Sequence, residues 1–313
     1  MSTTEALWPE LPYRNWRDTA VTLQLWTQIV GKIRLALTPW LNHSWHVPLY
    51  VTSRGLGTLA VPAGREILEL EFDFIAHRLR MRTSLGAERV LLLAPRSVSE
   101  FYRELMSKLH ELGIDVSIHE MPNEVADPVP FPRDNGHGSY DAAAAHAFWR
   151  ALIQADRILK QFRTGFLGKA SPVHFFWGSF DLAVTRFSGR GAPLHPGGIP
   201  GLPDAVTREA YSHEVSSAGF WPGNEAFPAA AFYSYAYPEP SGFRDRTVTS
   251  GAHFDERLEE FILPYETVRS ASDPDGLVLD FLATTYEAAA DAAHWDRTHL
   301  ECRSGVAGRV RPL

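Results

Sequence analysis

The sequence predicts an α+β protein with antiparallel sheets, packed helices and two similar halves. Apolar residues recur with the 3.6-residue period of amphipathic helices in several segments, and other segments alternate apolar and polar residues as half-buried strands do. The order helix, strands, helix occurs twice along 313 residues. A chain of this length allows about two domains. We therefore expect a helix–strands–helix unit in each half, and the repeated order suggests an internal duplication.

The first half is expected to begin with an amphipathic helix. Asn15 is a suitable cap, and the apolar stripe ends before Pro39. A short strand is expected at residues 46–52. The segments 68–74 and 78–82 alternate in the pattern of a hairpin, with acidic residues on one strand opposite arginines on the other. That charged face is either a binding surface or a set of cross-strand ion pairs, and ion pairs are the commoner case.

A second helix closes the first half. A strand is expected at residues 89–94, and Ser97 and Glu100 then form a capping box that predicts a helix start. Residues 115–121 are expected to return as a strand. The segment that follows is rich in proline and polar residues and lacks periodicity, so residues 122–139 are predicted to link the two halves.

The second half repeats the pattern. A helix is predicted over residues 140–162, and a final helix begins at Asp273, where Pro274 suits the first helical position. Strands are expected between these helices at 172–187, 214–220, 229–237 and 258–264. The predicted organisation is an N-terminal half (1–121), a linker (122–139), a C-terminal half (140–300) and a tail (301–313).

Composition argues against several classes of protein. The net charge is −7 and no dense basic stripe is present, so nucleic-acid binding is not expected. Cys302 is the only cysteine, which excludes an internal disulfide and a cysteine-based zinc site. No apolar run has the length of about 18 residues that a membrane span needs, and the first residues do not have the pattern of a signal peptide. We expect a cytoplasmic protein with no membrane partner.

Three segments resemble a known family. They are LWTQIVGKIRLALTPWLNHSWHVPLYVT, FWGSFDLAVTRFSGR and EAYSHEVSSAGFWPG. They are similar to the signature segments of a bacterial family of uncharacterised proteins, classed as a domain of unknown function. The resemblance covers essentially the whole chain and implies a compact protein. It implies no activity, cofactor or catalytic residue.

Familiar catalytic and nucleotide-binding motifs are absent from the sequence. There is no GxGxxG, no complete P-loop, no GxSxG and no HExxH. His43 and His46 lie three residues apart and could bind a divalent metal if a carboxylate came from elsewhere. The alternative is a pair of histidines bonded to backbone at a strand entry. We expect no cofactor and no stoichiometric metal.

The stretch HFFWGSFDLAVTRFSGR carries polar residues in an apolar setting. If it forms one strand, Trp177, Ser179 and Asp181 share one face, while His174 and Arg186 share the other. The first set has the composition of a pocket wall. The alternative is a central strand whose buried Asp181 is satisfied by a local partner.

Two later segments are further candidates. The loop over residues 189–204 is rich in proline and glycine, contains His195, and is long enough to be a lid, although a solvated insertion is the alternative. The segment 208–223 follows it, where His213 could act as a general base. If its strand pairs with the preceding one, Asp181 and His213 are expected to converge in a pocket.

We expect a soluble enzyme that acts on a small molecule, such as an anionic one, in a pocket of the C-terminal half. The alternative is a small-molecule-binding protein with an aromatic cavity, and a protein scaffold is a third possibility with less support. The sequence does not predict the reaction or the oligomeric state. The candidate catalytic residues are His213, Asp181 and His174, and the candidate ligand-binding residues are Trp177, Ser179, Arg186, Tyr211, Glu214, Trp221 and Lys169.

Overall fold

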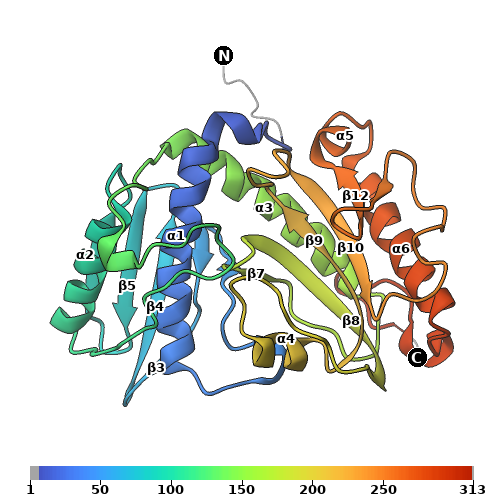
Figure 1. The fold of residues 1–313 in the computed structure, drawn as a ribbon, viewed down its shortest axis with the longest axis horizontal. Helices are drawn as coiled ribbons and strands as arrows, with labels where there is room; N and C mark the ends of the chain where they lie inside the picture. The colour runs from blue at the N-terminus through green and yellow to red at the C-terminus, as the bar shows by residue number, and fades with distance from the viewer. Residues whose placement is uncertain (1–6, 312–313) are drawn as a thin grey trace.

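Each half of the chain starts with a long helix and continues into an antiparallel sheet of six strands (Figure 1). The structure is a computed structural model that describes residues 7–311. It confirms the predicted α+β class. The first sheet has the order β1-β2-β4-β5-β6, and β3 pairs with β4. Its strands are β1 (Tyr50–Val51), β2 (Gly55–Gly57), β3 (Val61–Ala63), β4 (Glu66–Asp73), β5 (Arg78–Thr83) and β6 (Glu88–Leu92).

The second sheet has the order β11-β12-β10-β9-β8-β7. Its edge strand β7 meets the first sheet through a bridge, because Leu49 and Phe175 exchange backbone hydrogen bonds of 2.8 and 2.7 Å. The two sheets therefore touch at β1 and β7. The strands are β7 (His174–Phe176), β8 (Asp181–Gly191), β9 (His213–Trp221), β10 (Ala231–Tyr237), β11 (His253–Asp255) and β12 (Glu260–Pro264).

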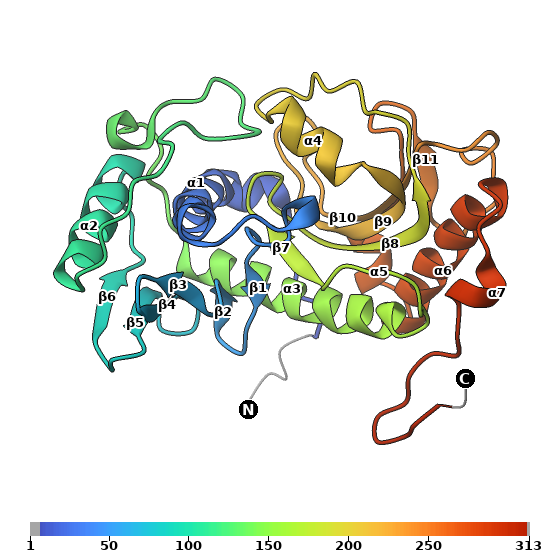
Figure 2. The same cartoon turned by 90° about the horizontal axis from the view of Figure 1, so that it is seen from below.

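Helices pack on the sheets from different sides. Figure 2 shows α1 above the first sheet, whereas α3, α5 and α6 lie below the second. The helices are α1 (Tyr13–Leu37), α2 (Val98–Glu111), α3 (Ala142–Arg163), α4 (Asp204–Ala210), α5 (Tyr265–Arg269), α6 (Pro274–Ala292) and α7 (Arg297–Leu300), with short 3₁₀ turns at Asn42–Ser44 and Phe131–Arg133.

One hydrophobic core runs through both halves. In the first half, Trp26 of α1 stacks on Phe101 of α2 with ring centroids 4.6 Å apart. In the second, Phe148 of α3 stacks on Phe180 at 5.1 Å. The order helix, sheet, helix occurs in each half as expected, while the domain boundaries and the duplication remain predictions.

Local sequence signals placed several helix starts correctly. Ser97 and Glu100 form the expected capping box at α2, and the Asp273 side chain caps α6 by accepting from the Gly276 N–H. The expected cap at Asn15 is wrong, because α1 begins two residues earlier, at Tyr13, and Pro12 occupies the cap position without a side-chain bond. The fixed φ of Pro12 suits the extended cap position, and its carbonyl accepts a 2.9 Å hydrogen bond from the Asn15 N–H, so Asn15 lies inside the first turn and not before it.

The strand expected at residues 115–121 is also wrong. These residues are not in a helix or strand, although their exposure varies from residue to residue. Alternation favours an extended chain, but a strand needs a neighbour that accepts its backbone hydrogen bonds. No strand of the described chain pairs with this segment.

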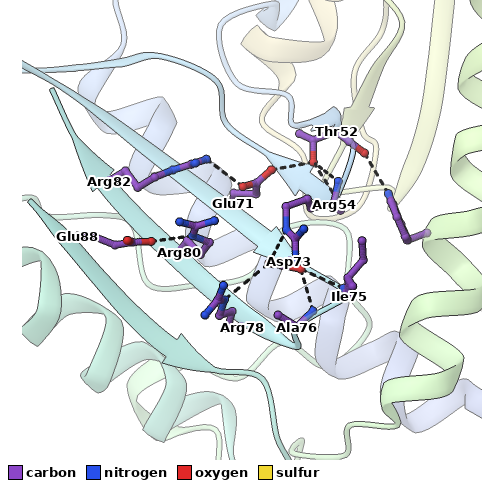
Figure 3. Close-up of polar contacts among 12 residues, drawn as sticks. Thr52, Arg54, Glu71, Asp73, Ile75, Ala76, Arg78, Arg80, Arg82 and Glu88 are labelled. Atoms are coloured by element: carbon purple, nitrogen blue, oxygen red, sulfur yellow. Dashed lines mark hydrogen bonds and ion pairs between the residues drawn. The ribbon is translucent and has the colours of Figure 1, made fainter. Parts of the chain in front are cut away.

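The predicted charged hairpin is confirmed (Figure 3). In β4 and β5, Glu69 lies opposite Arg82. Asp73 lies opposite Arg78, and Figure 3 shows this pair together with the contact between Arg82 and Glu71. Asp73 is fully buried and accepts from Arg54 at 2.7 Å and from the N–H groups of Ala76 and Ile75. Burial alone would raise the pKa of Asp73, but these hydrogen bonds lower it below its ordinary value. The contacts support the structural interpretation of this face, with acids and arginines paired.

Candidate functional site

The stretch from His174 to Gly191 is a hairpin and not one strand. Residues 177–180 form a turn between β7 and β8, closed by a 2.9 Å hydrogen bond from the Phe180 N–H to the Phe176 carbonyl. Phe180 has a left-handed backbone with φ of 62°. The expectation that Trp177, Ser179 and Asp181 share one strand face is therefore wrong, because the turn breaks the two-residue alternation on which it rested.

Asp181 is nevertheless the centre of a polar cluster. It is the first residue of β8 and is buried, with 7% of its surface exposed. The Ser179 hydroxyl donates to Oδ1 and the Tyr233 hydroxyl donates to Oδ2. Tyr233 reaches Asp181 from β10 across the intervening β9. Gly219 of β9 permits this, since an added Cβ there would lie 2.5 Å from the Tyr233 oxygen.

Glu124 approaches the same turn from the predicted linker. An added Cβ on Gly178 would lie 2.1 Å from Glu124 Oε1, so the carboxyl group rests directly against the glycine. The neighbouring Asn123 holds this segment in place. Its N–H donates to the Gln28 side chain at 2.8 Å, and its side-chain oxygen accepts from Lys32 of α1.

Glu260 and two further tyrosines complete the cluster. Glu260 is the first residue of β12. In its ionised form it raises the pKa values of Tyr211, Tyr233 and Tyr235. The hydroxyl groups of Tyr211 and Tyr235 are 3.0 Å apart, and Tyr235 also bonds to Ser217. We call Glu124, Asp181, Glu260, Tyr211, Tyr233 and Tyr235 the carboxylate–tyrosine cluster.

The environment makes these carboxyl groups hold their protons. Burial first, and the charge of Asp181 second, raise the pKa of Glu124 to about 7. Burial, followed by the charges of Asp181 and Asp255, raises the pKa of Glu260 to about 8. Burial also raises the pKa of Asp181, although the hydrogen bonds from Ser179 and Tyr233 oppose the shift. No lysine or arginine in residues 7–311 lowers the pKa of any of these three carboxyl groups.

The cluster is deep but still open to water. Desolvation dominates the pKa of each carboxyl group, yet Glu124, Glu260, Tyr211 and Tyr235 are only half-buried. Groups that are desolvated and still accessible are typical of the floor of a binding site. Two hollows of the described chain lie elsewhere, one of about 280 Å³ beside Glu214 and a shallow one beside α2.

A loop and a short helix lie beside the cluster. Figure 2 shows α4 and the segment before it on the side of the second sheet away from α3 and α6. The expected loop over residues 189–204 begins as the end of β8, is irregular over 192–203 and ends at α4. His195 stacks on Tyr211 with ring centroids 5.0 Å apart, and Gly201 accepts a 2.7 Å bond from Asn123. The loop thus contacts Tyr211, which belongs to the cluster, and Asn123, which is next to Glu124 in the sequence.

Two predicted ligand-binding residues lie on the other face of the sheet. Arg186 is buried against the aromatic rings of Phe162, at 3.5 Å, and Tyr286, at 4.4 Å, and donates to the Phe162 carbonyl near the end of α3. Glu214 pairs with Arg190 at 2.6 Å. Both residues therefore stand apart from the carboxylate–tyrosine cluster, because neighbouring strand positions point to opposite faces.

Two other candidates are packed between the halves. Trp177 is buried against Gly31 of α1, and its N–H donates to the Val47 carbonyl at 3.0 Å. His174 is 1% exposed, and burial lowers its pKa to about 3, with the charges of Arg34 and Arg163 adding to the effect. A histidine that stays neutral at this depth does not exchange protons with a ligand at neutral pH.

The remaining candidates are spread along β9. Trp221 is half-buried and stacks on Phe227 at 5.7 Å, at the end of β9 nearest Asp181. His213 starts the same strand and pairs with Gly191. Eight residues of extended strand, about 26 Å, separate the two ends. The expected convergence of Asp181 and His213 is therefore wrong, since the strands pair in the register that places these residues at opposite ends.

Sequence reasoning missed Glu124, Glu260, Tyr233 and Tyr235. The tyrosines had a usable signal, because the segment AFYSYAY places Tyr233 and Tyr235 on one strand face. The two glutamates had none, since each comes from a part of the chain distant from Asp181 and is influenced by its charge only in the folded protein. Within the described residues, no three or more His, Cys, Asp or Glu side chains are arranged to hold a metal. His43 bonds instead to the Ala210 carbonyl, and His46 accepts from the Leu41 N–H.

These features define an α+β protein with a half-buried carboxylate–tyrosine cluster on one sheet. The chain belongs to a family of unknown function, DUF5996, whose family model matches residues 8–302. This confirms the resemblance to an uncharacterised family. Comparisons with curated proteins and with solved structures gave no match. None of the helices in residues 7–311 combines the length and apolar character that crossing a membrane requires.

Proposed function

We propose that this protein is an enzyme that acts on a small molecule at the carboxylate–tyrosine cluster by acid–base chemistry. The observation that supports it is the gathering of Glu124, Asp181 and Glu260 without a balancing cation in the described chain. Carboxyl groups with pKa values of about 7 and 8 are partly protonated at neutral pH. One can then donate a proton while another accepts one, which is what a general acid–base pair requires.

The substrate is expected to carry hydrogen-bond donors or a positive charge near the cluster. Carboxylate oxygens accept hydrogen bonds, and a cation would offset the mutual repulsion of the three acids. The hydroxyl groups of Tyr211 and Tyr235 stay protonated because burial raises their pKa values, so they can orient a polar substrate. The loop over residues 192–203 would cover the substrate after binding.

Turnover tests this proposal. The purified protein is incubated with a mixture of small polar metabolites, and untargeted mass spectrometry follows the loss of each compound. We expect the wild type to consume at least one compound, Asp181→Asn to lose that activity, and Glu259→Gln to keep it. Glu259 is a matched control because it is adjacent to Glu260 but exposed to solvent.

A binding protein without chemistry is the second candidate. The stacked Tyr233 and Tyr235 rings, with centroids 6.3 Å apart, favour it because they form an aromatic wall beside the carboxyl groups. A compound that stabilises the wild type against heat, does so less in Asp181→Asn, and is recovered unchanged would support this candidate and contradict the enzyme.

A further inference from the structure

A lysine and two histidines meet at the far end of β8 from Asp181. The Lys169 ammonium nitrogen lies 2.6 Å from His43 Nε2. It also lies 4.6 Å from the centroid of the Phe187 ring and 5.3 Å from that of Trp45. The His213 ring is 5.9 Å from the His43 ring. We call His43, Trp45, Lys169, Phe187 and His213 the lysine–histidine cluster.

The hydrogen bonds define the charge of this cluster. An ammonium can only donate, so His43 Nε2 accepts from Lys169. The proton of His43 is then on Nδ1, which donates to the Ala210 carbonyl at 3.1 Å. His43 is therefore neutral and adds no positive charge beside the lysine. No carboxylate of residues 7–311 forms an ion pair with Lys169, so the ammonium retains two donors and an unbalanced charge.

The backbone holds His43 in this place at a cost. His43 and Ser44 are consecutive non-glycine residues with a left-handed φ of 57° each. Such residues cost about 1–3 kcal/mol and concentrate at functional sites. On the other side, the Phe187 N–H donates to the Lys169 carbonyl at 3.0 Å, which fixes the lysine beside β8. Lys169 and His43 are thus held by different parts of the fold, the lysine by β8 and the histidine by the 3₁₀ turn Asn42–Ser44.

His213 adds a further donor. Its Nδ1 is 3.0 Å from the Ser212 hydroxyl, while its Nε2 has no hydrogen-bond partner among the described residues. When the serine donates to Nδ1, the proton of His213 is on Nε2. Lysine and histidine N–H groups close to aromatic rings suit an oxyanion, because charge-assisted hydrogen bonds are stronger where surrounding water is limited.

We propose that the lysine–histidine cluster is a binding site for an oxyanion group of a small molecule, such as a phosphate or carboxylate group. The site is separate from the carboxylate–tyrosine cluster. Asp181 and Phe187 are six residues apart on β8, about 20 Å along an extended strand. The proposal therefore stands or falls independently of the proposed enzyme.

Calorimetric titration with inorganic phosphate, and separately with acetate, tests the site. We expect saturable binding of at least one anion to the wild type, and a loss of about tenfold or more in affinity in Lys169→Gln. Lys169→Arg should keep most of the affinity, because it keeps the charge. Lys108→Gln is the matched control, since Lys108 is a helical lysine already paired with Glu104 at 3.5 Å.

Histidine resonances locate the binding independently. Phosphate or acetate should shift the ring signals of His43 and His213 and leave that of the exposed His299 unchanged. Failure of both anions to bind would overturn the proposal. Equal weakening in Lys169→Gln and Lys108→Gln would also overturn it, since it would show unspecific attraction. Phosphate binding that survives in Asp181→Asn would show that the two clusters act separately.

Discussion

Tyr233 donates its hydroxyl hydrogen to Asp181 from two strands away, across Gly219. This contact holds a buried carboxyl group in a position that local sequence does not dictate. Two donors satisfy Asp181, yet burial still raises its pKa. The arrangement costs stability at neutral pH, and such costs are typical of functional sites.

Tyr233→Phe should destabilise the protein. The variant keeps the ring but removes one of the two donors to Asp181, which leaves a buried acceptor unsatisfied. We expect a loss of about 1–3 kcal/mol in the free energy of unfolding at pH 7, measured by denaturant titration. Tyr102→Phe is the control, because its bond to Glu120 is exposed and 3.2 Å long. Equal losses in the two variants would contradict the role assigned to Tyr233.

Glu260→Gln should stabilise the protein above neutral pH. The raised pKa means that the folded state holds the Glu260 proton more tightly than the unfolded chain does. Wild-type stability therefore falls as the pH rises from the ordinary value of 4.5 to about 8. Glutamine does not ionise, so its advantage should grow over this range, to the order of 2 kcal/mol after allowance for partial exposure.

The comparison uses thermal or denaturant unfolding at pH 5 and pH 8.5. Glu259→Gln serves as the control, since the Glu259 side chain is 72% exposed. An advantage of Glu260→Gln that is the same at both pH values would contradict the raised pKa.

Gly178→Ala should displace Glu124. The new methyl group would lie 2.1 Å from Glu124 Oε1, a distance at which one of the groups must move. The turn does not require a positive φ at Gly178, so the fold should persist, with a loss of about 1–3 kcal/mol from overpacking. Any turnover or ligand binding found for the wild type should fall.

Gly136→Ala is the matched control for this change. Its added carbon would be 3.8 Å from the nearest atom, an ordinary contact. Circular dichroism and thermal unfolding establish that both variants fold. Full wild-type function in Gly178→Ala would show that the position of Glu124 does not matter.

His174 should remain neutral from pH 5 to pH 8. Burial lowers its pKa to about 3, so its ring resonances should not shift in a nuclear magnetic resonance titration over this range. His110 provides an internal comparison, because its hydrogen bond to Asp115 raises its pKa and its resonances should shift. Titration of His174 near pH 6.5 would restore it as a candidate proton carrier.

Sequence reasoning succeeded where structure depends on neighbouring residues. The capping box at Ser97 and the paired charges of β4 and β5 are local patterns, and both are confirmed. It failed where the structure depends on contacts between residues that are far apart in the sequence. The turn at residues 177–180 interrupts an apolar run that resembles a continuous strand, and residues 115–121 have the exposure of a strand but no partner.

The candidate site shows the same limit. Asp181, Ser179 and Tyr211 were identified from their residue types in an apolar context, and the structure places them at or beside the cluster. Glu124 lies in a segment predicted to be a linker. Its approach to Gly178 depends on how the two halves pack, which periodicity and composition do not describe.

The protonation of Glu124 and Glu260 tests the central claim most directly. Carbon-13 labelling of glutamate allows the side-chain carboxyl resonances to be followed from pH 4 to pH 9, with Glu124→Gln and Glu260→Gln used for assignment. The account predicts titration midpoints at about 7 for Glu124 and about 8 for Glu260. Midpoints near 4.5 for both residues would show ordinary, solvated carboxylates and would contradict a desolvated acid–base site.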